Sequence, residues 1–339
     1  MTTIKENFSL KRFNAFGLDV SCRYFADIGS EKDIQKLIAD KKYSGSPKFV
    51  LGGGSNILFT KDFDGIILHN CFEGIGVVSV DDDYAFVKAG AGEIWHQFVL
   101  YCIEKNFGGI ENLSLIPGYV GAAPIQNIGA YGEELQNVFH SLTAIDLAKG
   151  EQKIFSHDEC RFGYRDSVFK REAKNTYIIT DVTLRLNKHP EANTTYGAIE
   201  HELEKIKITS PTIRDVSNVV IKIRQSKLPD PKTIGNCGSF FKNPVISLDK
   251  YDRLKKIFPD LVAYPAPGYM TKLSAGWMIE QCGWKGKRVG NAGMHKDQAL
   301  VLVNYGGATG RELLTHAAEV QKSVKETFGI IMEAEVNVL

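Results

Sequence analysis

A glycine-rich, nearly uncharged stretch in the first half of the chain restricts the fold more than any other feature. The stretch IPGYVGAAPIQNIGAYGEE runs from Ile116 to Glu134 and carries charge only at its last two residues. It contains too much glycine and proline for a stable amphipathic helix and is too apolar for a solvated loop. We therefore predict buried, irregular backbone whose N–H and C=O groups pair with protein or with a flat ligand ring rich in donors and acceptors.

A second glycine cluster, GGGSN at Gly52–Asn56, lies within the segment PKFVLGGGSNILF, which reads as strand, glycine loop and strand. Consecutive glycines let several backbone N–H groups point the same way and form an anion-binding nest, so a phosphate or pyrophosphate is the natural ligand. The fingerprint G-x-G-x-x-G does not fit, because its third glycine would fall on Ile57 and no helix follows. The lysine of a Walker loop is absent. A plain turn therefore remains the alternative interpretation.

Length and composition exclude several classes of protein. The 339 residues predict two or three domains. A net charge of +1 without a basic stripe argues against nucleic acid as a partner. The opening residues contain no apolar signal-peptide core, and no apolar run reaches membrane-spanning length. We expect a cytoplasmic protein with no membrane association.

The six cysteines stand singly along the chain, without a CxxC pair and without a spacing to histidine that suggests a ligand set. In a reducing compartment such residues read as small apolar side chains. We therefore predict no metal site.

Apolar periodicity predicts helices and strands that alternate without strict βαβ regularity, so the expected fold class is α+β. The clearest helix spans 309–329, where Thr309 and Glu312 form a capping box and Gly329 ends the helix. An earlier helix is expected to begin after Ser30 as its N-cap. Further helices are predicted at 93–106, 213–227 and 272–284, and strands at 83–92, 177–187, 298–305 and 330–339.

Two of these strands carry side-chain predictions. The strand at 177–187 alternates apolar residues at even positions, so we expect one buried face. The strand at 330–339 would place Glu333 and Glu335 on the same face, because they are two residues apart. Between 187 and 212 the sequence turns polar, and we expect a domain junction there, with the second domain opening on the helix at 213–227.

Four motifs in this order, GGGSN, IPGYVGAAPIQNIGAYG, YRDSVFK and GNCGSFFKNP, resemble those of the UDP-N-acetylenolpyruvoylglucosamine reductases. The resemblance extends from FNAFGLDV near the start of the chain to MEAEVNVL at its end. It implies an FAD-binding domain of the vanillyl-alcohol-oxidase (PCMH) type, followed by a smaller α/β substrate-binding domain. The segment TTYGAIE, with Tyr196, resembles a tyrosine-bearing loop of the longer form of this family.

The resemblance also implies a division of the chain. The FAD-binding domain would cover residues 1–190, with a small α/β subdomain to about residue 70. Residues 191–211 would form the tyrosine loop and junction. Residues 212–339 would form the substrate-binding domain, whose last strand returns to the FAD site.

The activity implied is the reduction of UDP-N-acetylglucosamine enolpyruvate to UDP-N-acetylmuramate in peptidoglycan precursor synthesis. FAD would be bound non-covalently, NADPH would be the electron donor, and the protein would be a monomer. Ser239 is implied as the proton donor, while Arg165 and Glu335 would stabilise an enolate-like intermediate. Because serine is a weak acid, it needs neighbours that stabilise its alkoxide, and Lys227 and Lys242 are our hypothesis for these neighbours.

Each catalytic assignment has an alternative from the residues alone. Ser239 could be a turn serine, Arg165 could form a structural ion pair with Asp166, and Glu333 competes with Glu335. The resemblance further implies two binding sets. The cofactor set is Gly52, Gly53, Gly54, Ser55, Asn56, Ile125, Asn127, Gly129, Ala130 and Arg165; the substrate set is Tyr131, Tyr196, Arg224, Lys227, Asn243, Tyr264, Lys285 and Gln298.

The chain departs from the family pattern at two positions. Asn337 stands where many relatives have arginine, and Ala15 stands where threonine is commoner. Two further functions compete with the one implied. The first is a flavin oxidoreductase of the same fold with another substrate, and the second is a catalytically inactive protein that binds flavin or UDP-sugar. Retention of Arg165, Ser239 and Glu335 together disfavours the second.

Overall fold

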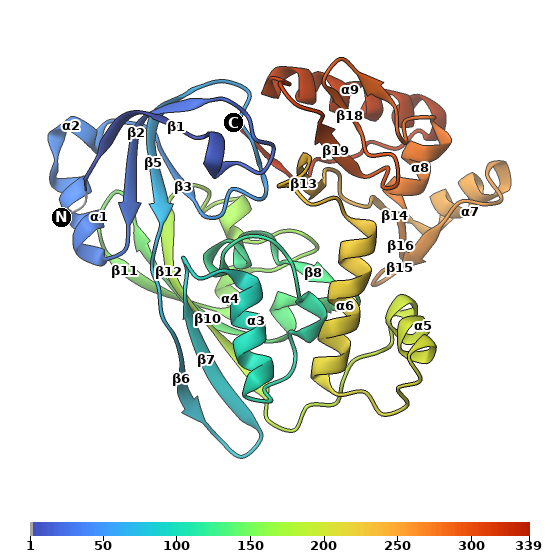
Figure 1. Ribbon diagram of the computed structural model, residues 1–339, viewed down its shortest axis with the longest axis horizontal. Coiled ribbons are helices and arrows are strands. Elements are labelled where there is room, and N and C mark those ends of the chain that lie inside the picture. The colour runs from blue at the N-terminus through green and yellow to red at the C-terminus, as the bar shows by residue number, and fades with distance from the viewer. Residues whose placement is uncertain (1–2) are drawn as a thin grey trace. The chain divides into compact units, whose positions relative to one another are not determined.

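The structure is a computed structural model that describes residues 3–339. These residues form two compact units, unit 1 and unit 2, which are described separately (Figure 1). Each unit draws on three segments of the chain. Unit 1 contains the residues up to Phe8, Cys22–Gly54 and Asp64–Ser226, and unit 2 contains Ser9–Ser21, Ser55–Phe63 and Lys227–Leu339.

Unit 1 begins with a four-stranded sheet in the order β1-β2-β5-β3, in which β3 and β5 run parallel. The predicted N-cap of the first helix is confirmed, because the Ser30 hydroxyl accepts a hydrogen bond from the backbone N–H of Asp33. Ile34 and Leu37 of this helix are buried. The elements are β1 Lys5–Ser9, β2 Ser21–Ile28, α1 Glu31–Ala39, α2 Lys41–Ser44, β3 Lys48–Leu51 and β5 Phe63–Asn70.

A five-stranded antiparallel sheet in the order β11-β10-β12-β7-β6 forms the second layer of unit 1. Its central strand β12 has the predicted bounds, but the prediction of a single buried face is wrong. Ile178 packs in the core of the first sheet and the adjacent Ile179 packs in the core beside this sheet, so both faces of β12 are covered. The elements are β6 Ile75–Val80, β7 Tyr84–Gly90, α3 Trp95–Glu104, β10 Phe139–Asp146, β11 Gln152–Ser156, α4 His157–Cys160 and β12 Tyr177–Asn187.

The glycine-rich stretch is irregular, as predicted, but it is only partly buried: its middle, from Val120 to Ile128, contains the buried residues, and most of the others are half-buried. It consists of short 3₁₀ turns and two very short strands, β8 Gly129–Ala130 and β9 Glu133–Glu134. Backbone bonds tie it to the sheet, including one from the N–H of Gly121 to the carbonyl of Ala91 (2.9 Å). Asn127 and Tyr131 have left-handed backbone, with φ of 44° and 50°.

Helices α5 Gly197–Lys205 and α6 Ile213–Lys227 pack against each other through a small apolar cluster that includes Leu203 and Val220. Helix α6 has the predicted bounds, yet through Ser226 it belongs to unit 1 rather than opening unit 2. The physical reason is its contacts. The Ser217 hydroxyl lies 2.8 Å from that of Ser114, and buried apolar residues of α6 face α5.

The main sheet of unit 2 has the order β13-β19-β18-β17 and is antiparallel. The capping box of its longest helix is confirmed, because Thr309 and Glu312 each accept from the other's backbone N–H. The predicted C-cap is also confirmed, since Gly329 has φ of 65°. The elements are β13 Gly235–Ser239, α8 Ala275–Gln281, β17 Arg288–Val289, β18 Ala292–Met294, β19 Val301–Asn304 and α9 Gly310–Phe328.

Two smaller sheets complete unit 2. One has the order β14-β16-β15, and the other pairs β20 with β4 in parallel. The predicted strand at 330–339 is therefore wrong over most of its length, because only Asn337–Val338 have a strand partner, Ile57–Leu58. The elements are β4 Ile57–Leu58, β14 Val245–Ser247, α7 Leu248–Ile257, β15 Ala263–Pro265, β16 Met270–Leu273 and β20 Asn337–Val338.

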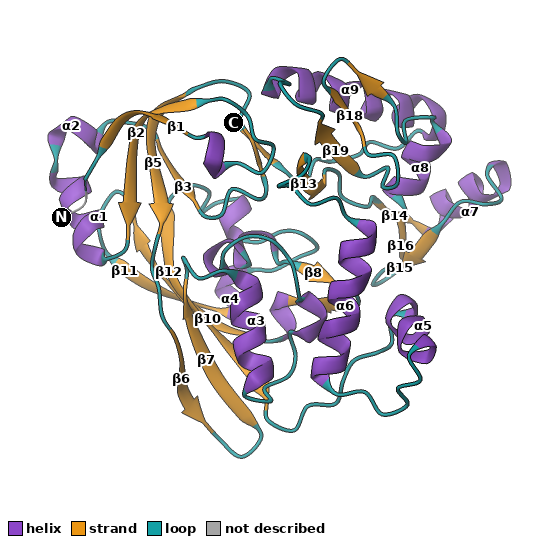
Figure 2. Cartoon of the chain, in the orientation of Figure 1, coloured by secondary structure: helices purple, strands orange, loops and turns teal. Residues whose placement is uncertain are grey.

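Figure 2 shows helices and strands mixed along the chain in both units, in agreement with the predicted α+β class. Among residues 3–339, no helix combines the length and the apolar character that crossing a membrane requires.

Candidate functional site

The glycine loop connects β3 and β4, so the predicted strand–loop–strand order is confirmed. A Cβ atom at Gly53 would lie 3.2 Å from the ring of Tyr119 and 3.3 Å from the Cα of Gly118, which is closer than most side chains tolerate. Gly54 has φ of 64°, a conformation that favours glycine. Close packing and left-handed backbone therefore explain two of the three glycines.

Asn127 organises the buried end of the glycine-rich stretch. Its side chain is fully buried and donates hydrogen bonds to Glu134 (2.9 Å) and to the carbonyl of Gly163 (3.1 Å). Its side-chain oxygen accepts from the backbone N–H of Gln136 (3.0 Å), whose own amide donates to Glu134 (2.7 Å). This network fixes the backbone of Asn127, whose carbonyl faces Arg165 (3.4 Å).

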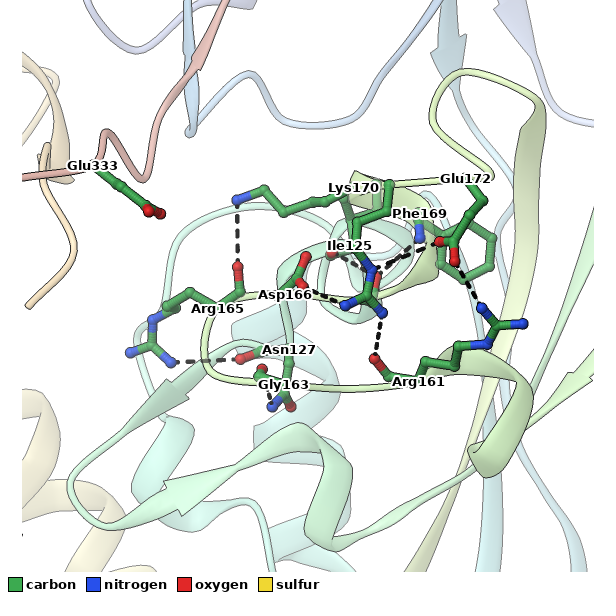
Figure 3. Close-up of polar contacts among 12 residues, drawn as sticks. Ile125, Asn127, Arg161, Gly163, Arg165, Asp166, Phe169, Lys170, Glu172 and Glu333 are labelled. Carbon is green, nitrogen blue, oxygen red and sulfur yellow. Dashed lines mark hydrogen bonds and ion pairs between the residues drawn. The ribbon is translucent and has the colours of Figure 1, made fainter. Parts of the chain in front are cut away.

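Arg165 lies at the tip of a tight turn that Gly163 and Asp166 close with two backbone hydrogen bonds. Its own φ is 54°, and its guanidinium donates to the carbonyl of Asn127 (Figure 3) and to that of Gly129. A Cβ at Gly129 would come within 2.8 Å of this guanidinium, so glycine is needed there. The side chain is 17% exposed, which leaves part of the guanidinium accessible to a ligand.

The alternative that Arg165 pairs with Asp166 is not what the structure contains. The carboxylate of Asp166 instead accepts from Arg171 (2.8 Å), which also donates to the carbonyl of Arg161. The carboxylate of Glu134 lies 4.0 Å from the Arg165 guanidinium. Figure 3 shows the second arginine network, in which Arg161 also pairs with Glu172.

Three residues of the predicted substrate set lie together in unit 1. The rings of Tyr131 and Tyr196 meet edge to face at 5.3 Å. Arg224 donates to the carbonyl of Leu115 (3.2 Å) and interacts with the Tyr131 hydroxyl. Burial lowers the pKa of the Arg224 guanidinium and raises that of the Tyr131 phenol, with the two groups partly compensating each other. A half-buried cation beside the Tyr131 phenol, which itself packs on Tyr196, is suited to an anionic or hydrogen-bonding ligand.

Ser239 ends strand β13 just after an irregularity in its pairing with β19. Gly238 has φ of 69°, and its N–H donates to the side-chain oxygen of Asn236 (2.9 Å). Asn236 is buried and also donates to the carbonyls of Pro229 and Ile234. This bulge is fixed by one side chain, and it determines where the partly exposed Ser239 lies.

Glu335 is brought next to Ser239 along the backbone of unit 2. The N–H of Glu335 donates to the carbonyl of Phe240 (2.8 Å), and Ala334 bridges to Phe241. Asn56 donates from its side chain to the carbonyl of Glu335 (3.2 Å), which ties the glutamate to the end of the glycine loop. Of the three predicted catalytic residues, Ser239 and Glu335 thus lie in unit 2, and Arg165 lies in unit 1.

The competitor Glu333 has a different environment. Its carboxylate is 74% exposed and lies 3.3 Å from the ammonium of Lys242. The argument that Glu333 and Glu335 share a strand face is wrong, because this segment is not a regular strand. Lys242 is thus engaged by Glu333, whereas Lys227 is exposed at the end of α6.

The rest of the predicted substrate set is spread over unit 2. The side-chain oxygen of Asn243 accepts from the N–H of Ala275 and so supports the start of α8. Lys285 pairs with Glu280 (2.8 Å). Tyr264 is 40% exposed on β15, and Gln298 precedes β19. These side chains therefore occupy separate elements of unit 2, at positions distinct from the bulge that carries Ser239.

The two departures from the family pattern are accommodated. Ala15 accepts from the N–H of Asn236 through its backbone carbonyl, so this bond needs no hydroxyl. Asn337 donates from its backbone and its side chain to the carbonyl of Asn56 (3.1 and 3.2 Å), so it helps to hold the end of the glycine loop.

Cys237 lies two residues before Ser239. Burial raises the pKa of its thiol to about 12, which agrees with an unreactive cysteine.

Several positioning residues escaped the sequence analysis. Glu134 and Gln136 orient Asn127, Tyr119 covers Gly53, and Asn236 fixes the bulge before Ser239. Asn236 lies within the GNCGSFFKNP motif, and an asparagine two residues before a glycine is a signal for such a side-chain turn. The other contacts join residues whose proximity depends on tertiary structure.

One group of potential metal-ligating side chains lies outside the predicted site residues. His69 and Cys71 are two residues apart, and with Asp27 their ligand atoms lie within 4.8 Å of one another. The local pattern H-x-C is visible in the sequence, but Asp27 comes from another strand.

Two protein families match separate parts of the chain. The FAD binding domain family matches residues 23–156, and the family described as UDP-N-acetylenolpyruvoylglucosamine reductase, C-terminal domain, matches residues 230–339. The first match contains Gly52–Asn56 and the buried stretch around Asn127.

The residues matched by the FAD binding domain family offer hydrogen-bond donors of the kind that FAD requires. The loop Gly52–Asn56 contains no carboxylate and offers glycine backbone, a hydroxyl and an amide, which suits a pyrophosphate. The partly exposed side chain of Arg165 donates to the carbonyls of Asn127 and Gly129, within the irregular backbone from Ile125 to Ala130. Irregular backbone offers N–H and C=O groups of the kind that a flavin ring requires.

Whole-chain comparisons agree with these matches. The UDP-N-acetylenolpyruvoylglucosamine reductase of Flavobacterium johnsoniae is 51% identical over 337 residues, which are 99% of each chain. Two solved structures share the fold. The UDP-N-acetylenolpyruvylglucosamine reductase of Thermus caldophilus has a TM-score of 0.67 at 21% identity, covering 100% of this chain and 99% of that one. The 6-hydroxy-D-nicotine oxidase of Arthrobacter nicotinovorans has a TM-score of 0.52 at 12% identity, covering 100% and 88%.

The fold is therefore that of the PCMH-type flavoenzymes, with an FAD-binding domain followed by a reductase C-terminal domain. Near-complete coverage at 51% identity decides the family. The chain belongs to the UDP-N-acetylenolpyruvoylglucosamine reductases, FAD-dependent oxidoreductases of peptidoglycan precursor synthesis.

Proposed function

We propose that this protein reduces UDP-N-acetylglucosamine enolpyruvate to UDP-N-acetylmuramate, with NADPH as the electron donor. The observation that carries the mechanistic part is the backbone ladder in unit 2, where the N–H of Glu335 donates to the carbonyl of Phe240, the residue after Ser239. This bond supports the proposal, because the segments that carry the proposed proton donor and the carboxyl group are hydrogen-bonded to each other. Reduction of an enol ether needs both a hydride and a proton, and these residues can manage the proton.

FAD, when bound, would supply the hydride-transfer chemistry that links the nicotinamide to the substrate. The residues that would hold it are Gly52–Asn56, Ile125, Asn127, Gly129 and Ala130, with Arg165 at the edge of the ring site. Binding would be non-covalent. The left-handed backbone of Gly54 and Asn127 is already fixed by the fold, so the cofactor would meet a largely preorganised site.

Arg165 would bind the enolpyruvyl carboxylate. A guanidinium presents two parallel donors to a carboxylate and stabilises it more as negative charge develops. The carbonyls of Asn127 and Gly129 hold the Arg165 side chain, and Glu134 lies at 4.0 Å from it. Its position is therefore fixed before substrate binds, which avoids reorganisation during the reaction.

Ser239 would deliver the proton to the substrate carbon. Its hydroxyl is acidic enough only if nearby charges or dipoles stabilise the alkoxide, or if it relays a proton. The Gly238 bulge, held by Asn236, fixes its direction. Lys227 would be the stabilising cation, because the ammonium of Lys242 is already paired with Glu333.

Glu335 would act on the same enolate-like intermediate, beside the carboxylate of the substrate. A carboxyl near the substrate carboxylate is favourable only if it is protonated or if Arg165 compensates the charge. A protonated Glu335 could donate a hydrogen bond to the developing enolate. The bond from Asn56 to the Glu335 carbonyl fixes its backbone.

The UDP-sugar would be bound by the remaining residues of the substrate set. Tyr196, Tyr131 and Arg224 form one group, in which the half-buried guanidinium of Arg224 suits a phosphate or a carbonyl oxygen. Asn243 would have its side-chain NH₂ available, since its oxygen supports α8. Lys227, Tyr264, Lys285 and Gln298 would complete the set.

A monomeric state and a cytoplasmic location are parts of this proposal. The division into residues 1–190, 191–211 and 212–339 is proposed as a division by function along the sequence, which differs from the two compact units because α6 packs within unit 1 and two N-terminal segments pack within unit 2. The pairing of Asn337–Val338 with Ile57–Leu58 supports the return of the last strand toward the glycine loop.

The two half-reactions separate the proposed roles. In Ser239→Ala, NADPH should bleach the flavin at the wild-type rate, while recovery of the flavin absorbance by UDP-N-acetylglucosamine enolpyruvate should slow by about 10²-fold or more. Ser247→Ala, which removes the N-cap hydroxyl of α7 instead, is the matched control and should leave both rates unchanged. Equal slowing of both half-reactions in Ser239→Ala would refute the proton-donor role.

A further inference from the structure

Three side chains of different ligand chemistry meet in the first sheet of unit 1, and none of the three is assigned to the reduction. Nδ1 of His69 lies 2.8 Å from Oδ1 of Asp27 and 3.2 Å from Sγ of Cys71. The thiol lies 3.9 Å from the same carboxylate oxygen. A carboxylate, an imidazole and a thiol therefore surround one point.

The backbone holds these groups in place. Asp27 belongs to β2 and His69 to its neighbour β5, and the N–H of Cys71 donates to the carbonyl of Ile28 (2.8 Å). The His69 ring is 14% exposed and lies against the ring of Phe25, with centroids 5.8 Å apart. Both sheet pairing and ring packing therefore limit the movement of the three side chains.

The distances suit a tetrahedral cation. Zinc binds thiolate sulfur at about 2.3 Å, imidazole nitrogen at about 2.0–2.1 Å and carboxylate oxygen at about 2.0–2.2 Å, so neighbouring ligand atoms lie roughly 3.3–3.6 Å apart. The three observed separations, 2.8, 3.2 and 3.9 Å, lie on both sides of this range. Shifts of a few tenths of an ångström in each side chain would produce the coordination geometry.

A purely structural His–Asp pair or a redox-active cysteine would account for less of the cluster. A His–Asp contact needs no thiol, as the exposed neighbours His157 and Asp158 show elsewhere in unit 1, with Nδ1 and Oδ1 3.4 Å apart. A redox-active cysteine alone would leave unexplained why the Asp27 carboxylate and the His69 ring converge on the same thiol.

We propose that Asp27, His69 and Cys71 form a binding site for a borderline-soft divalent cation of the zinc class. The three side chains supply one oxygen, one nitrogen and one sulfur, and the fourth position is open to water or another ligand. Lys5 modulates the site, because its ammonium lies 3.2 Å from the other carboxylate oxygen of Asp27 and competes with a cation for that group. The site is independent of the reduction chemistry, and its ring contact with Tyr119, at 6.0 Å, places it near the glycine loop.

The test uses the full-length protein with its flavin and two cations. Zn²⁺ binding is followed by isothermal titration calorimetry. Co²⁺ binding is followed by difference absorption, in which thiolate coordination gives a charge-transfer band. We expect one cation per chain and a thiolate band. Cys71→Ser should abolish the band, and both Cys71→Ser and His69→Gln should weaken Zn²⁺ binding by at least about tenfold.

Matched variants separate this site from surface binding. Cys282→Ser removes another partly exposed thiol, and His157→Gln removes the other His–Asp pair, so both should leave the stoichiometry and the band unchanged. Lys5→Ala should tighten Zn²⁺ binding, because it removes the competing cation. Absence of stoichiometric binding to the wild-type protein would overturn the proposal. A thiolate band that survives Cys71→Ser, or that disappears in Cys282→Ser, would also overturn it.

Discussion

At the scale of single residues, the site depends on side chains that hold others in position. Asn236 shows this most clearly, because one buried amide fixes the bulge that directs Ser239. The sequence allowed Ser239, Glu335 and Arg165 to be selected through family resemblance. It could not give the orientation of Arg165, because the carbonyls of Asn127 and Gly129 meet it only in the folded chain.

Replacing Asn236 by alanine should affect both stability and chemistry. The change leaves the Gly238 N–H and the carbonyls of Pro229 and Ile234 without their side-chain partner, which costs about 1–3 kcal/mol. We also expect slower flavin recovery by substrate, since Ser239 loses its fixed direction. Urea denaturation and half-reaction kinetics measure the two effects.

Asn304→Ala is the matched control. Asn304 is also a buried asparagine of unit 2, with hydrogen bonds to Phe16, Gly306 and Ala308. It should lose similar stability while its flavin recovery stays near the wild-type rate. If both variants slowed flavin recovery equally, the positioning role of Asn236 would be wrong.

Arg165→Lys tests the carboxylate-binding role. Lysine keeps the charge but cannot present two parallel donors or reach both backbone carbonyls. We expect kcat to fall by about 10²-fold or more, with little change in the melting temperature. Arg171→Lys alters the neighbouring Asp166 pair instead and should keep kcat near wild type. Equal loss of kcat in the two variants would contradict the assignment.

At the scale of helices and strands, local sequence signals predicted where helices end. Where strands form depended on pairing between segments that are distant in the sequence. The ends of α9 follow from Thr309, Glu312 and Gly329, because capping chemistry acts within one turn. The segment after α9 was wrongly predicted as a strand. Its apolar alternation reflects burial of Ile330, Met332 and Val336, whereas strand hydrogen bonds need a partner that local sequence does not identify.

Thr309→Ala should destabilise the protein by about 1 kcal/mol, because the N–H of Glu312 loses its acceptor. Thr309→Ser retains the hydroxyl and should change stability by only a few tenths of that amount. Thermal denaturation of the two variants measures the difference. Identical melting temperatures would show that the capping box contributes nothing measurable.

At the scale of the whole molecule, predicting the architecture from sequence required the family resemblance. Each unit uses segments far apart in the chain, such as Ser9–Ser21 and Lys227–Leu339 in unit 2. Composition and periodicity each describe one segment of the chain and carry no information on contacts between distant segments. They gave the α+β class, but they could not show that helix α6 packs with α5 in unit 1.

Stability should fall as the solution becomes acidic. Burial lowers the pKa of His96 in unit 1 and of His316 in unit 2, where Lys287 acts in the same direction. The unfolded chain, whose histidines titrate near pH 6.5, then takes up protons before the folded chain does. The stabilisation is complete above about pH 6.5 and is lost as the pH falls through the folded pKa values.

The melting temperature should therefore be lower at about pH 5.5 than at about pH 7.5. His316→Met, which replaces the ring by an uncharged side chain of similar size, should reduce this difference. His140→Gln, on the exposed side of β10, is the control and should leave it unchanged. The same pH dependence in His316→Met and wild type would contradict the role of His316.

The central claim is that one protein accepts electrons from NADPH and passes them to an enolpyruvyl UDP-sugar. The most direct test is the anaerobic visible spectrum of the purified protein, taken before NADPH, after NADPH and after UDP-N-acetylglucosamine enolpyruvate. We predict a flavin band that bleaches with NADPH and returns with the substrate. A band that bleaches but does not return would indicate an oxidoreductase with another acceptor, and no flavin band even after added FAD would contradict the account of both glycine-rich segments.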